Sequence, residues 1–140
     1  MQKENQWYCS KCKDHQDASK KISLSKTPEI LIIHLKRFVK RVGRRYVTFN
    51  KINDFIDYPI SNWDLKDFCI PGSDNKSVVY DLIGVVNHYG KMGGGHYIAV
   101  ANNFVKERWI KFDDEDVSYA DEDDVINRFA YVLFYKRRRK

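Results

Sequence analysis

The sequence predicts an α+β domain dominated by β-structure, with a mostly antiparallel sheet and one or two short helices. Short segments rich in aliphatic and aromatic residues recur along the chain, and four of them fall within the last sixty or so residues. Between those four segments, only one stretch has helical character. A length of 140 residues is that of one ordinary domain.

The clearest predicted strand is 29–38, which follows Pro28. Side chains alternate between the two faces of a strand, so Leu31, Ile33 and Leu35 are expected to share one face. The other predicted strands are 46–49, 79–87, 96–101, 109–112 and 130–135. Most of these segments are separated by turn-like residues, which favours antiparallel neighbours.

Two segments are predicted to be helical. Residues 63–68 form one short turn with Asn62 as its cap. Residues 121–129 begin with acidic side chains, which the helix dipole favours in a first turn. The acidic run is therefore interpreted as a helix start rather than as a binding site.

Charge and composition narrow the function classes. The net charge is +6, but residues 136–140 carry five of these positive charges, so the body is close to neutral and nucleic-acid binding is weakly supported. No apolar run approaches the roughly 18 residues of a membrane span, and no secretory signal is visible at the N-terminus. An odd count of three cysteines without such a signal predicts a reducing compartment, the cytoplasm or the nucleus.

The segment 90–97 contains the strongest candidate for chemistry. Four glycines lie among the six residues before His96, and a loop without side chains can form a channel for an extended peptide. Taken alone, the segment fits a flexible hairpin with a surface histidine equally well. Asp113 and Asp114 follow 17 and 18 residues later, where one hairpin return would bring a carboxylate to the imidazole. A carboxylate there would fix the tautomer and leave the other ring nitrogen as a general base.

A histidine–carboxylate pair of this kind calls for a nucleophile, and a cysteine is usual in a reducing compartment. Cys69 lies outside the C-x-x-C pair, but the following Pro71-Gly72 argues against the helix start that would activate its thiol. Cys69 is better interpreted as a small, partly buried hydrophobe. The sequence therefore lacks an evident nucleophile.

Cys9 and Cys12 form a single C-x-x-C on a predicted hairpin knuckle. Zn²⁺ normally takes four ligands, so this pair is half of a zinc site, with His15 near enough to be a third ligand. A knuckle without metal is the second interpretation. A redox pair is the third, because the βαβ context of redox motifs is missing.

Together, these motifs resemble the C-terminal half of the catalytic domain of the ubiquitin-specific proteases (peptidase C19 family). In detail they are most similar to the subgroup that carries DUSP and ubiquitin-like modules. The matching segments, in the family's order and spacing, are 7–12 (WYCSKC), 33–38 (IHLKRF), 80–88 (YDLIGVVNH), 93–97 (GGGHY), 109–117 (WIKFDDEDV) and 130–135 (AYVLFY). They span nearly the whole chain except the basic end.

The resemblance implies a papain-like fold, with 1–25 in the fingers and zinc knuckle, 26–135 in the palm, and 136–140 as a basic tail. It implies a thiol protease that cleaves the amide or isopeptide bond after the C-terminal glycine of ubiquitin, without a cofactor for catalysis. By the same resemblance, His96 is the catalytic base, Asp113 orients it and Asp114 supports it.

The resemblance also implies binding residues. The residues expected to border the channel for the ubiquitin C-terminus are His88, Gly94, Gly95 and Tyr97. Cys9 and Cys12 would be two of four ligands of a structural zinc. The expected partners are ubiquitin, ubiquitinated proteins and the N-terminal half of the same catalytic domain.

The chain departs from the family pattern in two places. The cysteine box that holds the nucleophile is absent, and so is the second C-x-x-C pair. The chain alone is therefore expected to be inactive, because the covalent route needs the thiol. Two alternatives from other classes stay open: a non-catalytic ubiquitin-binding or scaffold module, and a zinc-knuckle nucleic-acid binder.

Overall fold

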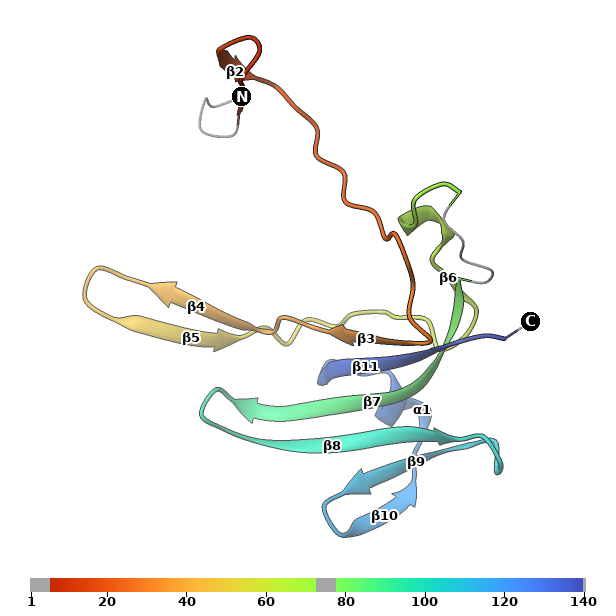
Figure 1. Ribbon diagram of the computed structural model, residues 1–140. Coiled ribbons are helices and arrows are strands. Elements are labelled where there is room, and N and C mark those ends of the chain that lie inside the picture. The colour runs from red at the N-terminus through yellow and green to blue at the C-terminus, as the bar shows by residue number, and fades with distance from the viewer. Residues whose placement is uncertain (1–5, 73–77, 140) are drawn as a thin grey trace.

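The computed structural model describes residues 6–72 and 78–139, and its main feature is one large antiparallel sheet (Figure 1). Four strands follow one another along the chain and pair with their neighbours: β7 (Val79–Lys91), β8 (Gly94–Asn103), β9 (Arg108–Asp113) and β10 (Asp116–Tyr119). On the other side of β7 lies β11 (Ala130–Arg137), and β3 (Ile30–His34) pairs with β11. The strand order is therefore β10-β9-β8-β7-β11-β3, and β6 (Trp63–Asp64) adds a short pairing at the start of β7.

One face of this sheet carries the core. The residues with the least exposure include Tyr80, Leu82, Val100, Leu133 and Tyr135. The segment around Tyr58 packs on these residues: Tyr58 itself is buried in the same cluster, and the hydroxyl of Tyr135 donates to the carbonyl of Pro59 at 2.9 Å. As the alternation predicts, Leu31, Ile33 and Leu35 pack against this core, whereas Ile32 between them is exposed. The predicted fold class, a mostly antiparallel and β-dominated α+β domain, is confirmed.

The opposite face of the sheet is apolar as well. Strand register aligns two rows of side chains across it: His34, Val132, Val86, Ala99, Phe112 and Val117 in one row, and Ile32, Phe134, Gly84, Ala101, Ile110 and Tyr119 in the other. Ile32, Phe112 and Val117 remain exposed. The described part of the chain thus packs one face of the sheet and leaves much of the other open.

Two hairpins project from the sheet (Figure 1). The first joins β1 (Trp7–Cys9) to β2 (Asp14–Gln16), at the end of a long segment without regular structure. The second joins β4 (Phe38–Val42) to β5 (Val47–Lys51). The predicted strand 29–38 therefore ends at His34, and a new strand begins at Phe38.

The break between β3 and β4 is fixed by a buried arginine. Arg37 is 2% exposed, and its Nε donates to the carbonyl of Ala130 at 2.6 Å. Its Nη1 donates to the carbonyls of Ile52 and Asp54 at 3.0 and 2.9 Å. A buried guanidinium needs such acceptors, so this arginine anchors the base of the β4–β5 hairpin against the start of β11.

Both helix predictions were too long. In 63–68, the chain first pairs with β7 as β6 and then forms a 3-10 turn, η2 (Lys66–Phe68), whose cap is Leu65 rather than Asn62. Asn62 instead has a φ of 57° and uses its backbone N–H to bind Asp81. Helix α1 is confined to Glu122–Val125 because the chain at Ile126 turns extended.

The strands differ from the prediction in two further ways. One strand, β10, was not predicted, and its four side chains are all exposed. β11 continues through Arg137, so two residues assigned to a basic tail belong to the sheet. No helix among the described residues has the length and hydropathy that crossing a membrane requires.

Candidate active site

The structure brings the predicted histidine–carboxylate pair into contact. His96 lies on β8, and Asp113 ends the neighbouring strand β9, to which β8 pairs from Ala99 onward. The imidazole Nε2 lies 2.5 Å from Asp113 Oδ1. This hydrogen bond fixes the ring and leaves Nδ1, for which no other described residue provides a hydrogen-bond partner. A ring held in this way can accept a proton at Nδ1.

The electrostatics favour the protonated ring. The hydrogen bond to Asp113 raises the pKa of His96, partial desolvation opposes this, and the charges of Asp113 and Asp114 add to the rise. Asp114 follows in the β9–β10 turn at a φ of 50°, and its carboxylate lies within 4.8 Å of the ligand atoms of the other two. The side chains of His96 and Asp113 are 46% and 39% exposed, so the pair is open to solvent.

Lys111, on the same strand as Asp113, reinforces the position of β9. Its ammonium lies 2.9 Å from Asp124 Oδ1. Asp124 also accepts from the backbone N–H of Asp121 at 3.1 Å, which closes the first turn of α1. The short acidic helix is thus connected to the strand that carries Asp113.

Three of the four glycines before His96, Gly90, Gly94 and Gly95, belong to strands rather than to a loop. β7 and β8 extend until Lys91 pairs with Gly94, and only Met92 and Gly93 form the turn. Gly93 has a φ of 92°, a conformation that glycine adopts at low cost. The sequence predicted a glycine-rich loop, whereas the structure has a tight hairpin with two strands of backbone and few side chains.

The buried ring of His88 leaves no space for a side chain at position 95, so this position requires glycine. A Cβ placed on Gly95 would lie 2.2 Å from His88 Nε2 and 2.5 Å from the carbonyl oxygen of Tyr89. The same construction on Gly94 meets nothing within 4 Å. The two glycines predicted to border a channel therefore differ: Gly95 makes room for a neighbour inside the molecule, and Gly94 faces open space.

His88 lies behind this surface. It is 3% exposed, and its ring contacts those of Phe38, Tyr97 and Tyr131, with centroids 5.5, 4.6 and 5.8 Å away. Its Nδ1 is buried without a hydrogen-bond partner among the described residues. Burial, followed by the charge of Lys51, lowers the pKa of His88 and keeps the ring neutral. Tyr97, by contrast, is 54% exposed, although its ring packs against that of His88.

Lys51 was not singled out by its sequence context. Its ammonium donates to the backbone carbonyl of His88 and lies 6.0 Å from the ring centroid of Phe129. The end of the β4–β5 hairpin is thereby attached to the strand beside the histidine site. Nothing in the local sequence distinguishes this lysine from its many neighbours, because the contact joins residues 37 positions apart.

The structure places Cys69 away from His96. Cys69 follows η2 and forms a parallel bridge with Leu24, near β6. β6 pairs with Tyr80 at the start of β7, whereas His96 pairs with Tyr89 near the other end. Most of the length of β7 therefore separates them. The other two cysteines lie on the β1–β2 hairpin, so no cysteine of this chain joins the His96 cluster.

The Cys9–Cys12 pair forms the predicted hairpin knuckle. Hydrogen bonds from the backbone of Cys12 and then of Lys11 lower the pKa of the Cys9 thiol, which favours the thiolate that zinc binds. His15 pairs in register with Tyr8, and its ring stacks edge-on against that tyrosine. Among the described residues, no third ligand completes a group with the two cysteines. The donor chemistry fits half of a zinc site.

Comparison with known proteins identifies the family. The sequence profile described as "Ubiquitin carboxyl-terminal hydrolase" matches residues 1–135. Human "Ubiquitin carboxyl-terminal hydrolase 19" is 45% identical over 142 aligned residues, which cover 96% of this chain and 10% of that protein. Human "Ubiquitin carboxyl-terminal hydrolase 15" is 45% identical over 135, covering 96% and 13%. The chain thus spans about a tenth of the length of these relatives.

Solved structures agree. The "Structure of the SAGA Ubp8/Sgf11/Sus1/Sgf73 DUB module bound to ubiquitin aldehyde" aligns with a TM-score of 0.77 at 33% identity, covering 96% of this chain and 30% of that one. A likeness of this extent confirms the papain-like fold that the resemblance implies. The chain belongs to the ubiquitin carboxyl-terminal hydrolase family.

Proposed function

We propose that this chain supplies the histidine and carboxylate of a deubiquitinating thiol protease, which cleaves the amide or isopeptide bond after the C-terminal glycine of ubiquitin. The observation that supports this most is the 2.5 Å contact between His96 Nε2 and Asp113 Oδ1, next to the two glycines that begin β8. It occurs in a member of the ubiquitin carboxyl-terminal hydrolase family. Acyl transfer of this kind needs a base, an orienting carboxylate and a thiol.

In this reaction, His96 takes the proton of an attacking thiol at Nδ1 and later gives it to the leaving amine. The thiol sulfur bonds to the carbonyl carbon of the terminal glycine of ubiquitin, the bond from that carbon to the amine nitrogen breaks, and water then hydrolyses the resulting thioester to release ubiquitin. Asp113 holds the ring through Nε2 and stabilises the imidazolium, and Asp114 adds negative charge nearby. Gly94 and Tyr97 present the surface along which the ubiquitin C-terminus runs, while Gly95 and His88 form its backing.

The thiol comes from outside this chain. No cysteine here joins the His96 cluster, and the open apolar face of the sheet offers a surface for the N-terminal half of a complete catalytic domain. Alone, the chain is inactive. Residues 1–25 act as the zinc-knuckle part of the fingers, 26–135 as part of the palm, and Cys9 and Cys12 as two ligands of a structural zinc completed by that other half. The complete protease acts in the cytoplasm or the nucleus.

Hydrolysis of a fluorogenic ubiquitin C-terminal amide tests the proposal. The chain is assayed alone and fused to a cysteine-bearing N-terminal half, with His96→Ala as the inactive control. Activity of the fusion that is lost in His96→Ala is the expected result. Equal activity of the fusion and its His96→Ala variant would contradict the assigned role of the histidine.

The position of the cysteines also favours a second candidate, a non-catalytic ubiquitin-binding or scaffold module. A folded fusion that hydrolyses nothing, together with saturable binding of ubiquitin by the chain, would favour that module over the protease.

A further inference from the structure

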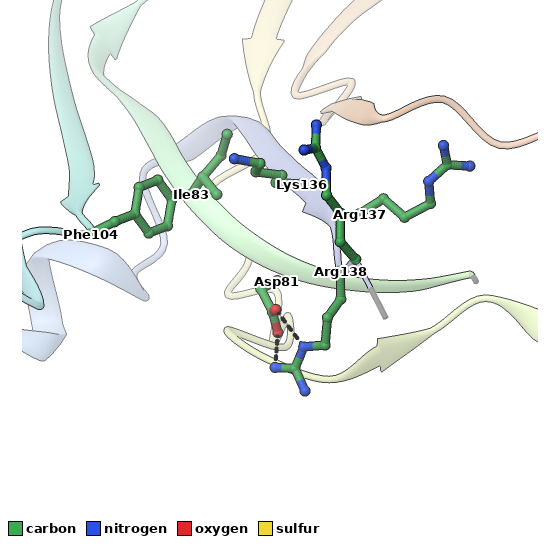
Figure 2. A pocket seen from close by; sticks show the side chains of 7 residues that line it. Asp81, Ile83, Phe104, Lys136, Arg137 and Arg138 are labelled. Atoms are coloured by element: carbon green, nitrogen blue, oxygen red, sulfur yellow. Dashed lines mark hydrogen bonds and ion pairs between the residues drawn. The ribbon is translucent and has the colours of Figure 1, made fainter. Parts of the chain in front are cut away.

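Figure 2 shows a basic cavity, and strand register places it at the end of the sheet opposite the histidine site. Lys136 and Arg137 pair in register with Asp81 and Tyr80 at the start of β7, whereas His96 pairs near its other end. The cavity has a volume of about 320 Å³. Its lining residues are Asp81, Ile83, Phe104, Lys136, Arg137, Arg138 and Arg139.

Two of the four cations are neutralised within the chain. Arg138 donates two hydrogen bonds to the carboxylate of Asp81, from Nε at 2.8 Å and from Nη2 at 2.7 Å. Both are drawn as dashed lines in Figure 2. Arg139 Nη2 lies 2.7 Å from a carboxylate oxygen of Glu29. These ion pairs join the last described residues to Asp81 on β7 and to Glu29, the residue just before β3.

The other two cations have no carboxylate partner within the described part of the chain. Among the described residues, neither Lys136 nor Arg137 forms an ion pair; Arg137 Nη1 donates to the carbonyl of Thr27 at 3.2 Å. The pKa of Glu29 reflects these charges. The hydrogen bond and charge of Arg139 lower it most, and the charges of Lys136 and Arg137 lower it further. A surplus of positive charge therefore remains at the cavity.

The cavity also has an apolar part. Ile83 is half-buried, and Phe104 is 61% exposed at the turn after β8. The Lys136 ammonium lies 5.5 Å from the centroid of the Phe104 ring, so the unpaired charge stands directly beside an exposed aromatic surface. A ligand that fits both features carries an anionic group next to an apolar group.

We propose that this cavity binds an acidic peptide segment of a partner protein, with a carboxylate at Lys136 and an apolar side chain against Phe104 and Ile83. The site is separate from the histidine site and does not rest on the proposed protease function. The cationic lining favours an anionic partner by charge complementarity. The lining provides one aromatic ring, Phe104, instead of a series for stacking bases, which favours a peptide over a nucleic acid.

Fluorescence anisotropy of a labelled peptide of consecutive glutamates ending in phenylalanine tests the site on the complete chain. We expect saturable binding at low ionic strength that Lys136→Gln weakens about tenfold, the worth of one charge-assisted hydrogen bond. Phe104→Ala, at an exposed turn, is expected to weaken binding without removing a charge. Lys40→Gln removes the same charge from the projecting hairpin and is expected to change the affinity less than about twofold.

Circular dichroism verifies that each variant is folded. Absence of binding to the folded chain would overturn the proposal, as would equal losses for Lys136→Gln and Lys40→Gln. Equal binding of a peptide with glutamines in place of the glutamates would overturn the role of the anion. Tighter binding of a single-stranded oligonucleotide that displaces the peptide would assign the site to nucleic acid instead.

Discussion

The large sheet and the β4–β5 hairpin use similar residues to opposite effect. Tyr80 and Val100 in the sheet are 0% and 1% exposed, whereas Tyr46 and Val42 in the hairpin are 71% and 73% exposed. Both regions have paired antiparallel strands, but only the sheet has a layer of side chains packed on it. The difference shows that strand pairing sets local shape, whereas stability comes from the covered face.

The largest expected effect is a direct test of this contrast. Tyr80→Ala should lower the free energy of unfolding by about 3–5 kcal/mol, because it empties a fully buried site and removes the hydroxyl that donates to Pro28. Tyr46→Ala should change it by less than about 0.5 kcal/mol. Urea denaturation measures both. Similar losses from the two variants would mean that the hairpin is also packed.

A second pair of variants compares two neighbouring glycines. Gly95→Ala should cost about 1–3 kcal/mol, since its Cβ would overlap His88 and the backbone of Tyr89. Gly94→Ala, with nothing within 4 Å, should be nearly neutral. Thermal denaturation of the two proteins separates them. A neutral Gly95→Ala would show that the His88 ring can move aside.

The connection between hairpin and sheet is the third test. Lys51→Met keeps most of the length of the side chain but removes the hydrogen bond to the His88 carbonyl, a loss of about 1 kcal/mol. Hydrogen exchange should accelerate for the amides of β4 and β5, while those of β7 and β11 stay protected. Equal acceleration in all four strands would mean that hairpin and sheet open together.

The smallest effect on stability is expected at the exposed histidine pair. Asp113→Asn should lower the pKa of His96, because the hydrogen bond and the negative charge both favour the imidazolium. NMR titration of the ring protons measures it, and an unchanged pKa would contradict the contact.

The sign of the pH dependence follows from linkage. The pKa of His96 is raised in the folded chain, so its contribution to stability is fully present below the ordinary value of about 6.5 and is lost as the pH rises through the folded-state value. Asp113→Asn should weaken this dependence, since only the charge of Asp114 would still raise the pKa of His96, and unfolding measured at several pH values would show it.

Sequence reasoning succeeded where the deciding contacts are local. Apolar segments located five strands of the large sheet, namely β3, β7, β8, β9 and β11, but not β6 or β10. The spacing of His96 and Asp113 within consecutive hairpin strands was enough to bring them together. It failed where distant residues decide. The break after β3 depends on Arg37 binding the carbonyl of Ala130, 93 positions away, and α1 is short because the chain must turn extended to reach β11. The burial of His88 likewise depends on rings from several strands.

The pairing of β3 with β11 has a consequence for synthesis. β3 ends at residue 34, and its partner begins only at residue 130. A ribosome adding about 5–20 residues per second reaches β11 roughly 5–20 s after β3 has been made. During this interval the newly made β3 has an unpaired edge and aliphatic side chains that other chains could bind. Completion of the sheet is therefore a late, long-range closure, and protection by a chaperone during translation would raise the yield of folded protein.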